Sequence, residues 1–336
     1  MRRFRDRDFL LTKDGFFFCV VGNVHPKDKI ISYLKYLPSK FGLWGRDNKY
    51  RRVVKFYSME EYEKNLNWLK RYYPYYLFKS KVLGGTFQAV PLNFILKHFK
   101  PEERLKEIFR SKDLDPLEDK VLDLVNYLSK EANLNIKDFG VTGSLLIKIH
   151  NLKFSDIDLV IYGKEGGKKL KEALKGKLEI PEEHLKTLIR KRKLKPSITK
   201  EIYKRRWNYR FFEGKFFSIH PVKVDLDEYY GKKIYRPLGL AKVKVLIEED
   251  EDSLFLPHKY GIKVLNFLKG KEVQNLKELC LYDGFYSILE KGEEVICYGK
   301  IEEVYDRELR EKYSRIVIGS REAKGEDFAL PLTLLL

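Results

Sequence analysis

One short run, residues 154–162, places two carboxylates inside an apolar segment and so limits the folds open to this chain. It reads Phe-Ser-Asp-Ile-Asp-Leu-Val-Ile-Tyr, and its only charged residues are Asp156 and Asp158. Side chains two positions apart lie on the same face of a β-strand, so both carboxylates face the same way. Their repulsion favours divalent metal ions, which also bind phosphate oxygens. An Asp-x-Asp pair alone is also common in surface turns, so the surrounding sequence must distinguish a metal site from a turn.

A Gly-Ser pair upstream supplies that context. Gly143 and Ser144 follow residues 138–142, which predict a short β-strand, and the apolar residues after them suit a short helix. Glycine lets a ligand approach the backbone, serine caps a helix, and free N–H groups at a helix start attract phosphate. The sequence therefore predicts phosphate-binding groups beside metal-binding carboxylates.

Together the two motifs resemble the signature of the nucleotidyltransferase superfamily, which contains DNA polymerase beta, CCA-adding enzymes and poly(A) polymerases. The resemblance is carried by Thr142-Gly-Ser and by Ser-Asp-Ile-Asp-Leu-Val at 155–160. The chain also resembles uncharacterised archaeal predicted nucleotidyltransferases. Many small members carry Arg-Gly shortly after the Gly-Ser, whereas this chain has Lys148 in that stretch.

The resemblance implies an α+β fold with a polymerase beta-like nucleotidyltransferase core, a mixed sheet with helices. An α+β N-terminal domain and a β-rich C-terminal domain would flank this core. We place the three domains at 1–110, 111–235 and 236–336. A chain of 336 residues is long enough for two or three domains with sizeable cores.

Local patterns predict several elements along the chain. A turn at 13–15 between two apolar runs predicts a hairpin, and helical spacing predicts a helix over 27–37. Asp115 followed by Pro116 predicts the start of a helix that runs to about residue 131. Residues 164–169 read as a flexible basic turn. The remainder from about residue 235 is rich in β-type runs, with a helix expected near 259–269.

The resemblance also implies a chemistry, the transfer of a nucleotide from an NTP, with ATP as one candidate, to an acceptor hydroxyl. Asp156 and Asp158 would hold two Mg²⁺ or Mn²⁺ ions. Asp225, on a later strand, would be the third catalytic and metal-binding carboxylate, with Asp227 as the alternative. The residues expected to bind the nucleotide are Gly143, Ser144, Lys148, Lys153 and Ser155.

Charge indicates a polyanionic partner. The net charge is +18, and residues 185–215 alone contain twelve Lys or Arg but only two Glu. This concentration favours nucleic acid, with RNA first, over a uniformly lysine-rich surface. The residues expected to contact nucleic acid are Arg190, Lys191, Arg192, Lys193, Lys195, Arg205 and Arg206.

Other features narrow the class of protein. Three scattered cysteines form no metal-ligand spacing and suggest a reducing compartment, so we expect a cytoplasmic protein. No stretch approaches the length of a membrane span. The six histidines lie far apart in sequence and offer no nucleophilic triad. Two alternatives stay open: nucleotide transfer to a protein or small molecule, and an inactive nucleotidyltransferase-like protein that binds nucleic acid.

Overall fold

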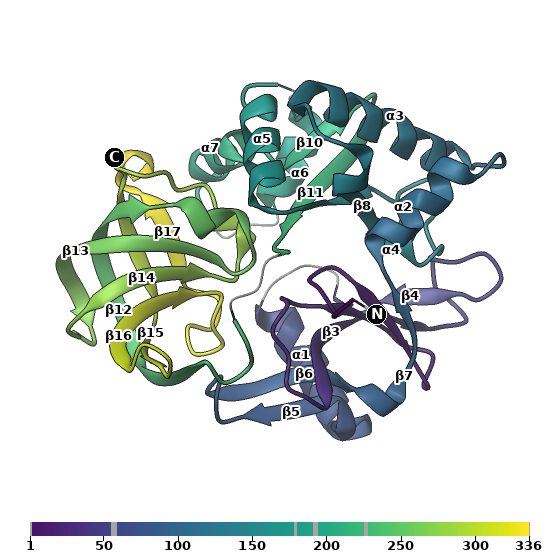
Figure 1. The fold of residues 1–336 in the computed structure, drawn as a ribbon. Coiled ribbons are helices and arrows are strands. Elements are labelled where there is room, and N and C mark those ends of the chain that lie inside the picture. Colours follow the sequence, from purple (N-terminus) through teal and green to yellow (C-terminus); the bar gives the residue numbers. More distant parts are fainter. Residues whose placement is uncertain (1, 55–58, 178–179, 191–193, 225–227, 336) are drawn as a thin grey trace. The chain divides into compact units, whose positions relative to one another are not determined.

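The structure, a computed structural model, describes all residues except 1, 55–58, 178–179, 191–193, 225–227 and 336 (Figure 1). Strands dominate residues 9–52 and 209–331, and most of the helices lie between residues 101 and 205, so the fold is α+β, as the sequence predicts. The chain divides into two compact units. Unit 1 contains residues 1–23, 28–53 and 90–226, and unit 2 contains 24–27, 54–89 and 227–336. The division into three domains at 1–110, 111–235 and 236–336 stays a prediction from the sequence.

Unit 1 begins with an antiparallel sheet in the order β3-β2-β1-β7, with β4 paired to the outer edge of β3. The predicted hairpin is present, because Phe9 pairs with Cys19 and Leu11 with Phe17 across the turn. The strands are β1 (Phe9–Thr12), β2 (Phe17–Val20), β3 (Lys29–Pro38), β4 (Tyr50–Arg52) and β7 (Ile95–Phe99).

The helix predicted over 27–37 is wrong, because these residues form strand β3. Buried Ile30, Ser32 and Leu34 alternate with partly exposed neighbours, which is the two-residue period of a strand. Apolar residues also occur at helical spacing here, so the two periods compete. Pairing with β2 decides between them, since it places Leu34 against Phe18 in a fully buried layer.

The second sheet of unit 1 has the order β10-β11-β9-β8. Strand β9 is antiparallel to β8 and parallel to β11, so the sheet is mixed. Its strands are β8 (Phe139–Thr142), β9 (Ile157–Tyr162), β10 (Tyr209–Phe212) and β11 (Lys215–Val222). The helices of unit 1 are α2 (Pro101–Arg110), α3 (Pro116–Ala132), α4 (Gly143–Leu146), α5 (Lys164–Leu174), α6 (Glu182–Arg190) and α7 (Pro196–Arg205), with short 3-10 turns at Leu92–Phe94 and Ile136–Asp138.

Helices α3 and α5 cover one face of this sheet (Figure 1). Leu124 and Leu128 of α3, and Leu170 of α5, share a buried core with Leu159 of β9 and Ile219 of β11. The predicted start of α3 is confirmed. The flexible turn predicted at 164–169 is wrong, because α5 already begins at Lys164; its two adjacent glycines are buried, and a Cβ on Gly166 would lie 3.0 Å from Ile161.

The two sheets of unit 1 meet at a second core. Leu146, Ile147 and Ile149, which follow the Gly-Ser pair, pack with Phe9 and Phe17 of the first sheet. The segment after α4 therefore joins the first sheet to the second, and the second sheet carries the candidate site.

Unit 2 contains the helix α1 (Met59–Tyr72), the hairpin strands β5 (Leu77–Ser80) and β6 (Gly85–Pro91), and a C-terminal barrel. The barrel strands are β12 (Lys233–Glu249), β13 (His258–Gly270), β14 (Leu276–Leu281), β15 (Glu294–Asp306), β16 (Glu311–Ile318) and β17 (Phe328–Pro331), with 3-10 turns at Pro74–Tyr76, Glu251–Leu254, Gly284–Tyr286 and Leu332–Leu334. The helix predicted near 259–269 is wrong, because β13 occupies this stretch; Tyr260 and Ile262 of β13 face the barrel interior.

Candidate functional site

Asp158 lies against the backbone of Gly143. Strands β8 and β9 pair so that Thr142 is opposite Asp158, and Gly143 follows directly as the first residue of α4. A Cβ on Gly143 would lie 2.3 Å from Oδ2 of Asp158, and the φ of Gly143 is +67°. Only glycine fits this position, because any side chain would collide with the carboxylate. The structure therefore brings the two predicted motifs into contact.

The two carboxylates differ in exposure. Asp158 is the second residue of β9 and is half-buried, whereas Asp156 precedes the strand and is exposed. Because Asp156 lies outside the strand, a shared face for the two carboxylates stays a prediction from the sequence. Asp156 is open to solvent, and Asp158 is enclosed on its inner side by Gly143.

Ser144 and Ser155 hold the loop between the two motifs. Both side chains are buried, and the Ser144 hydroxyl donates to Oγ of Ser155 at 3.4 Å. The backbone N–H of Asn151 donates to the same Ser155 oxygen at 2.9 Å. These two predicted nucleotide-binding residues therefore close the loop 147–156, and their hydroxyl groups are engaged with the protein itself.

The neighbouring strand β11 places Ser218 opposite Asp158. The Ser218 hydroxyl donates to Oδ1 of Asp158 at 2.6 Å, and Nε2 of His220 lies 3.0 Å from the same hydroxyl oxygen. Ser218 is 2% exposed, so this hydrogen bond is shielded from water. His220 therefore contacts the serine that orients Asp158.

The predicted third carboxylate, Asp225, and its alternative, Asp227, lie outside the described residues. Strand β11 ends at Val222, which pairs with Tyr162 at the far end of β9 from Asp158. Asp225 as the third metal ligand stays a prediction.

The two lysines predicted to bind the nucleotide differ in their contacts. Lys148 has a φ of +57°, and its ammonium group lies 3.0 Å from a carboxylate oxygen of Glu107. Lys153 is exposed, and its backbone N–H donates to the Asn151 side chain at 3.0 Å. Lys153 therefore has the more available ammonium group.

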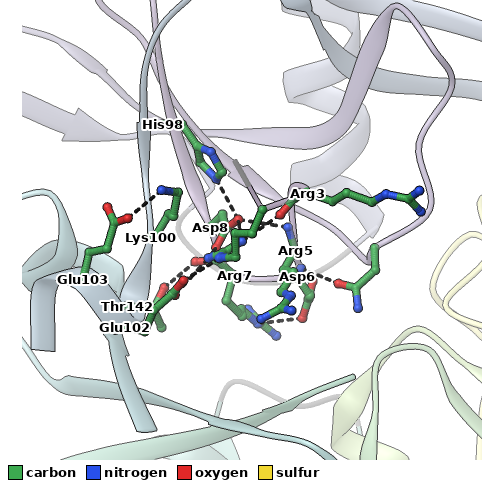
Figure 2. Close-up of polar contacts among 12 residues, drawn as sticks. Arg3, Arg5, Asp6, Arg7, Asp8, His98, Lys100, Glu102, Glu103 and Thr142 are labelled. Carbon is green, nitrogen blue, oxygen red and sulfur yellow. Dashed lines mark hydrogen bonds and ion pairs between the residues drawn. The ribbon is translucent and has the colours of Figure 1, made fainter. Parts of the chain in front are cut away.

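The N-terminal arm, residues 2–8, contacts the candidate site directly (Figure 2). The Thr142 hydroxyl donates to the backbone carbonyl of Arg7 at 2.7 Å, immediately before Gly143. Asp6 accepts from the backbone N–H of Gly22 at 2.8 Å, and the Asn23 side chain continues this network to the carbonyl of Lys223 at 2.7 Å. The arm therefore links β8 to the end of β11.

Residues at both ends of the arm, Arg2 and Asp8, form a partly buried ion cluster with Glu102 and His98. Arg2 donates to Asp8 at 2.7 Å and to Glu102, and the Tyr162 hydroxyl donates to Glu102 at 2.7 Å. Nε2 of His98 lies 2.7 Å from Asp8 (Figure 2). Burial alone would raise the pKa of Glu102, but the bonds from Arg2 and Tyr162 outweigh it and lower that pKa to about 2. Sequence reasoning missed this cluster; its only signal was the alternation of Arg and Asp in the first eight residues.

The residues predicted to contact nucleic acid are placed in part. Arg190 ends α6 and Lys195 precedes α7, while Lys191, Arg192 and Lys193 lie outside the described residues. Arg206 is buried, and its guanidinium lies 3.6 Å from the ring centroid of Tyr209. The charge of Arg206 is therefore engaged inside unit 1, whereas partly exposed Arg205 remains a surface candidate.

A second group of possible metal ligands is formed by Asp115, Glu118 and His150, whose ligand atoms lie within 4.8 Å of one another. Asp115 also caps α3, accepting from the backbone N–H of Glu118 at 3.0 Å, and Nε2 of His150 lies 2.6 Å from its other oxygen. The guanidinium of Arg104 is ion-paired with Glu118. Because the cap and an arginine already satisfy these acids, the group fits a structural ion network.

The fold and this geometry define an α+β protein with a paired-carboxylate site beside a Gly-Ser turn. The chain is 33% identical to the uncharacterised protein MJ1086 of Methanocaldococcus jannaschii over 349 aligned positions, which cover 96% of this chain and 97% of that protein. The chain belongs to the same family as MJ1086. No protein-family model matches the chain. No solved structure matches it either.

Among the described residues, no helix combines the length and the apolar character needed to cross a membrane.

Proposed function

We propose that the protein is a metal-dependent nucleotidyltransferase with a polymerase beta-like core in unit 1. The observation that carries the proposal is the contact between Gly143 and the Asp158 carboxylate, with exposed Asp156 two residues away. The mixed sheet β10-β11-β9-β8, backed by α3 and α5, supports it by fixing both motifs on one rigid layer.

The residues present fit Mg²⁺ or Mn²⁺. Asp156 and Asp158 offer only carboxylate oxygens, the ligand type that these hard cations prefer. Ser218 uses one lone pair of Asp158 Oδ1 and leaves both carboxylate oxygens with further acceptor capacity. Asp225 is proposed as the third ligand, on the basis of the sequence alone.

The reaction would join an acceptor hydroxyl to the α-phosphorus of an NTP. The acceptor oxygen forms the new P–O bond, the bond to the bridging oxygen breaks, and pyrophosphate leaves with that oxygen. The hydroxyl proton passes to a carboxylate, for which Asp225 is proposed. When bound, the metal ions supply positive charge to the phosphates and lower the pKa of the acceptor hydroxyl.

The protein's own residues would position the reactants. Ser218 holds Asp158 in one orientation, and the missing side chain of Gly143 leaves room for the Asp158 carboxylate beside the start of α4. Lys153, which is exposed, would offset charge on the departing pyrophosphate. Such positioning and charge compensation are most of what phosphoryl-type transfer requires of a protein.

Nucleic acid, with RNA favoured, is the proposed acceptor. The support is the concentration of twelve Lys or Arg residues between positions 185 and 215, including Arg190 and Lys195 beside the ends of α6 and α7. A small cationic acceptor does not suit so basic a segment.

Transfer from each labelled NTP, with Mg²⁺ or Mn²⁺ and with RNA, DNA or cell protein as acceptor, tests the proposal. Asp158→Asn should remove nearly all incorporation and leave the melting temperature almost unchanged. Asp123→Asn, which alters an exposed acid on α3, is the matched control and should stay active. Full activity in Asp158→Asn would refute the assignment, and labelling of protein instead of nucleic acid would replace the proposed acceptor.

A further inference from the structure

The barrel of unit 2 closes through five strands in the order β12-β13-β14-β16-β15, with β15 pairing back to β12. Strands β14 and β16 are parallel, and every other pair on this path is antiparallel. A five-stranded barrel with this Greek-key order has the topology of the OB-fold, whose outer sheet surface often binds oligonucleotides. Topology alone assigns no function, so a binding site must be found in the residues.

One part of the outer surface is already filled by the protein itself. Glu278, Arg315 and Glu302 form a row across β14, β16 and β15 through direct strand pairing. Arg315 is 4% exposed, donates to Glu302 at 2.9 Å, and has the Tyr235 ring 3.9 Å from its guanidinium. An OB-fold commonly binds its ligand on its second and third strands, here β13 and β14, and β14 contributes Glu278 to this buried ion network.

A second row of residues crosses the outer surface over β13, β12, β15 and β17. Lys242 pairs with Lys269 of β13 and with Tyr298 of β15, and Tyr298 pairs with Phe328 of β17. The rings of Tyr298 and Phe328 have centroids 6.4 Å apart, and the Lys242 ammonium lies 5.9 Å from the Phe328 ring centroid. We call these four residues the lysine–aromatic row. Lys269 is exposed and the other three are partly exposed.

The three lysines of this area differ from the nearby Lys244 in their ion pairing. Lys271 lies close to the row, since its backbone N–H donates to the Leu240 carbonyl at 2.9 Å. Among the described residues, no carboxylate lies within ion-pair distance of Lys242, Lys269 or Lys271. Lys244 on the same strand, by contrast, is paired with Glu294 at 2.7 Å.

This positive charge is local. Residues 233–336 contain seventeen Lys or Arg and nineteen Asp or Glu, so the barrel as a whole is not basic. Three uncompensated lysines beside two half-exposed aromatic rings therefore stand out from their surroundings.

We propose that the lysine–aromatic row is a binding site for single-stranded nucleic acid. Bases stack on Tyr298 and Phe328, since every base offers a π-face, while Lys242, Lys269 and Lys271 neutralise neighbouring phosphates. A duplex has its bases stacked internally and cannot use the rings in this way. The site goes beyond the proposed transfer reaction and does not depend on it.

Fluorescence anisotropy of a labelled twelve-residue oligouridine, and of oligothymidine, with the full chain measures the binding. The double substitution Tyr298→Leu with Phe328→Leu keeps apolar volume and removes both π-faces. It should raise the dissociation constant roughly tenfold or more, because both stacking contacts are lost. Lys242→Gln should reduce the dependence of binding on salt, whereas Lys277→Gln, which alters a lysine paired with Glu311, should not.

Cross-linking separates this row from the basic segment of unit 1. An oligonucleotide carrying 5-iodouridine should cross-link to the tryptic peptides 292–300 and 325–336, which contain Tyr298 and Phe328. Unchanged binding by the double variant, or cross-links confined to residues 185–215, would overturn the proposal. Equal competition by polyglutamate would point to an acidic protein partner instead. Asp158→Asn should bind as the wild type does, so failure of the transfer reaction and failure of this site can be told apart.

Discussion

Asp158 is fixed from two sides by residues of different chemistry. The Cα of Gly143 occupies the space beside Oδ2, and the Ser218 hydroxyl donates to Oδ1 at 2.6 Å. A carboxylate held in this way loses little further freedom when it binds a cation, which is the advantage of a preorganised ligand. Asp156 lacks this enclosure, since it is exposed before the strand begins.

Gly143→Ala tests this arrangement. The added methyl group would lie 2.3 Å from the Asp158 carboxylate oxygen, so the side chain of Asp158 must move. We expect nucleotide transfer to fall about a hundredfold, in line with the cost of displacing a catalytic group by about 1 Å. Thermal unfolding should show a loss of about 1 to 2 kcal/mol from the strained φ.

Gly176→Ala is the matched control for that strain. Gly176 has a φ of +72°, but a Cβ there would meet nothing within 4 Å. It should therefore lose stability without losing transfer activity. If both variants lost activity equally, the enclosure of Asp158 would have no special role.

At the scale of elements, the sequence predicted correctly the helix start that is determined by residues close together in the chain. The start of α3 was readable because Asp115 as N-cap and Pro116 at the first helical position are neighbours in sequence, and the structure adds a capping box between Asp115 and Glu118. Strands β3 and β13 were mistaken for helices because their apolar residues suit both periods, and only pairing with β2 or β12 selects the strand. The choice between helix and strand in such segments depends on pairing with another strand, which the segment's own pattern does not reveal.

Asp115→Ala should show the weight of that cap. The carboxylate accepts from the backbone N–H groups of Leu117 and Glu118 at 3.0 Å and contacts His150. We expect a loss of about 1 to 2 kcal/mol in the free energy of unfolding, measured by urea titration. Asp123→Ala, exposed in the middle of α3, should change it by less than about 0.5 kcal/mol. Equal effects would mean that the cap contributes nothing.

The N-terminal arm should make unit 1 sensitive to acid. Glu102 has its pKa lowered from an ordinary 4.5 to about 2 when folded, so it adds stability that is complete above pH 4.5. That contribution is lost as the pH falls from 4.5 towards 2, because the unfolded chain takes up the proton first. Glu102→Gln should flatten the fall of the melting temperature in this window. An unchanged profile would show that the contacts of Glu102 with Arg2 and Tyr162 do not stabilise the folded state.

At the scale of the whole molecule, the sequence predicted the site's two central motifs but not its surroundings. Gly143 and Asp158 are joined by a recognisable spacing, whereas the bond from Thr142 to Arg7 links residues 135 positions apart. Ser218 gave no signal either, because a serine in a strand has no motif of its own. Contacts of this kind depend on the pairing of β11 with β9 and on the arm's path, which no local pattern encodes.

Charge is a property of the molecule as a whole, but its distribution along this chain is uneven. Residues 185–215 hold more than half of the net charge of +18, so reversing Arg190 and Lys195 to Glu should weaken RNA binding. For each phosphate that the variant no longer neutralises, the slope of log affinity against log salt should also fall by about 0.7 for a single strand. The matched control reverses Lys106 and Arg110 of α2, which keeps the net charge of the two variants equal. If both variants bound RNA equally well across a salt series, net charge alone would attract the nucleic acid, and the segment 185–215 would have no local role.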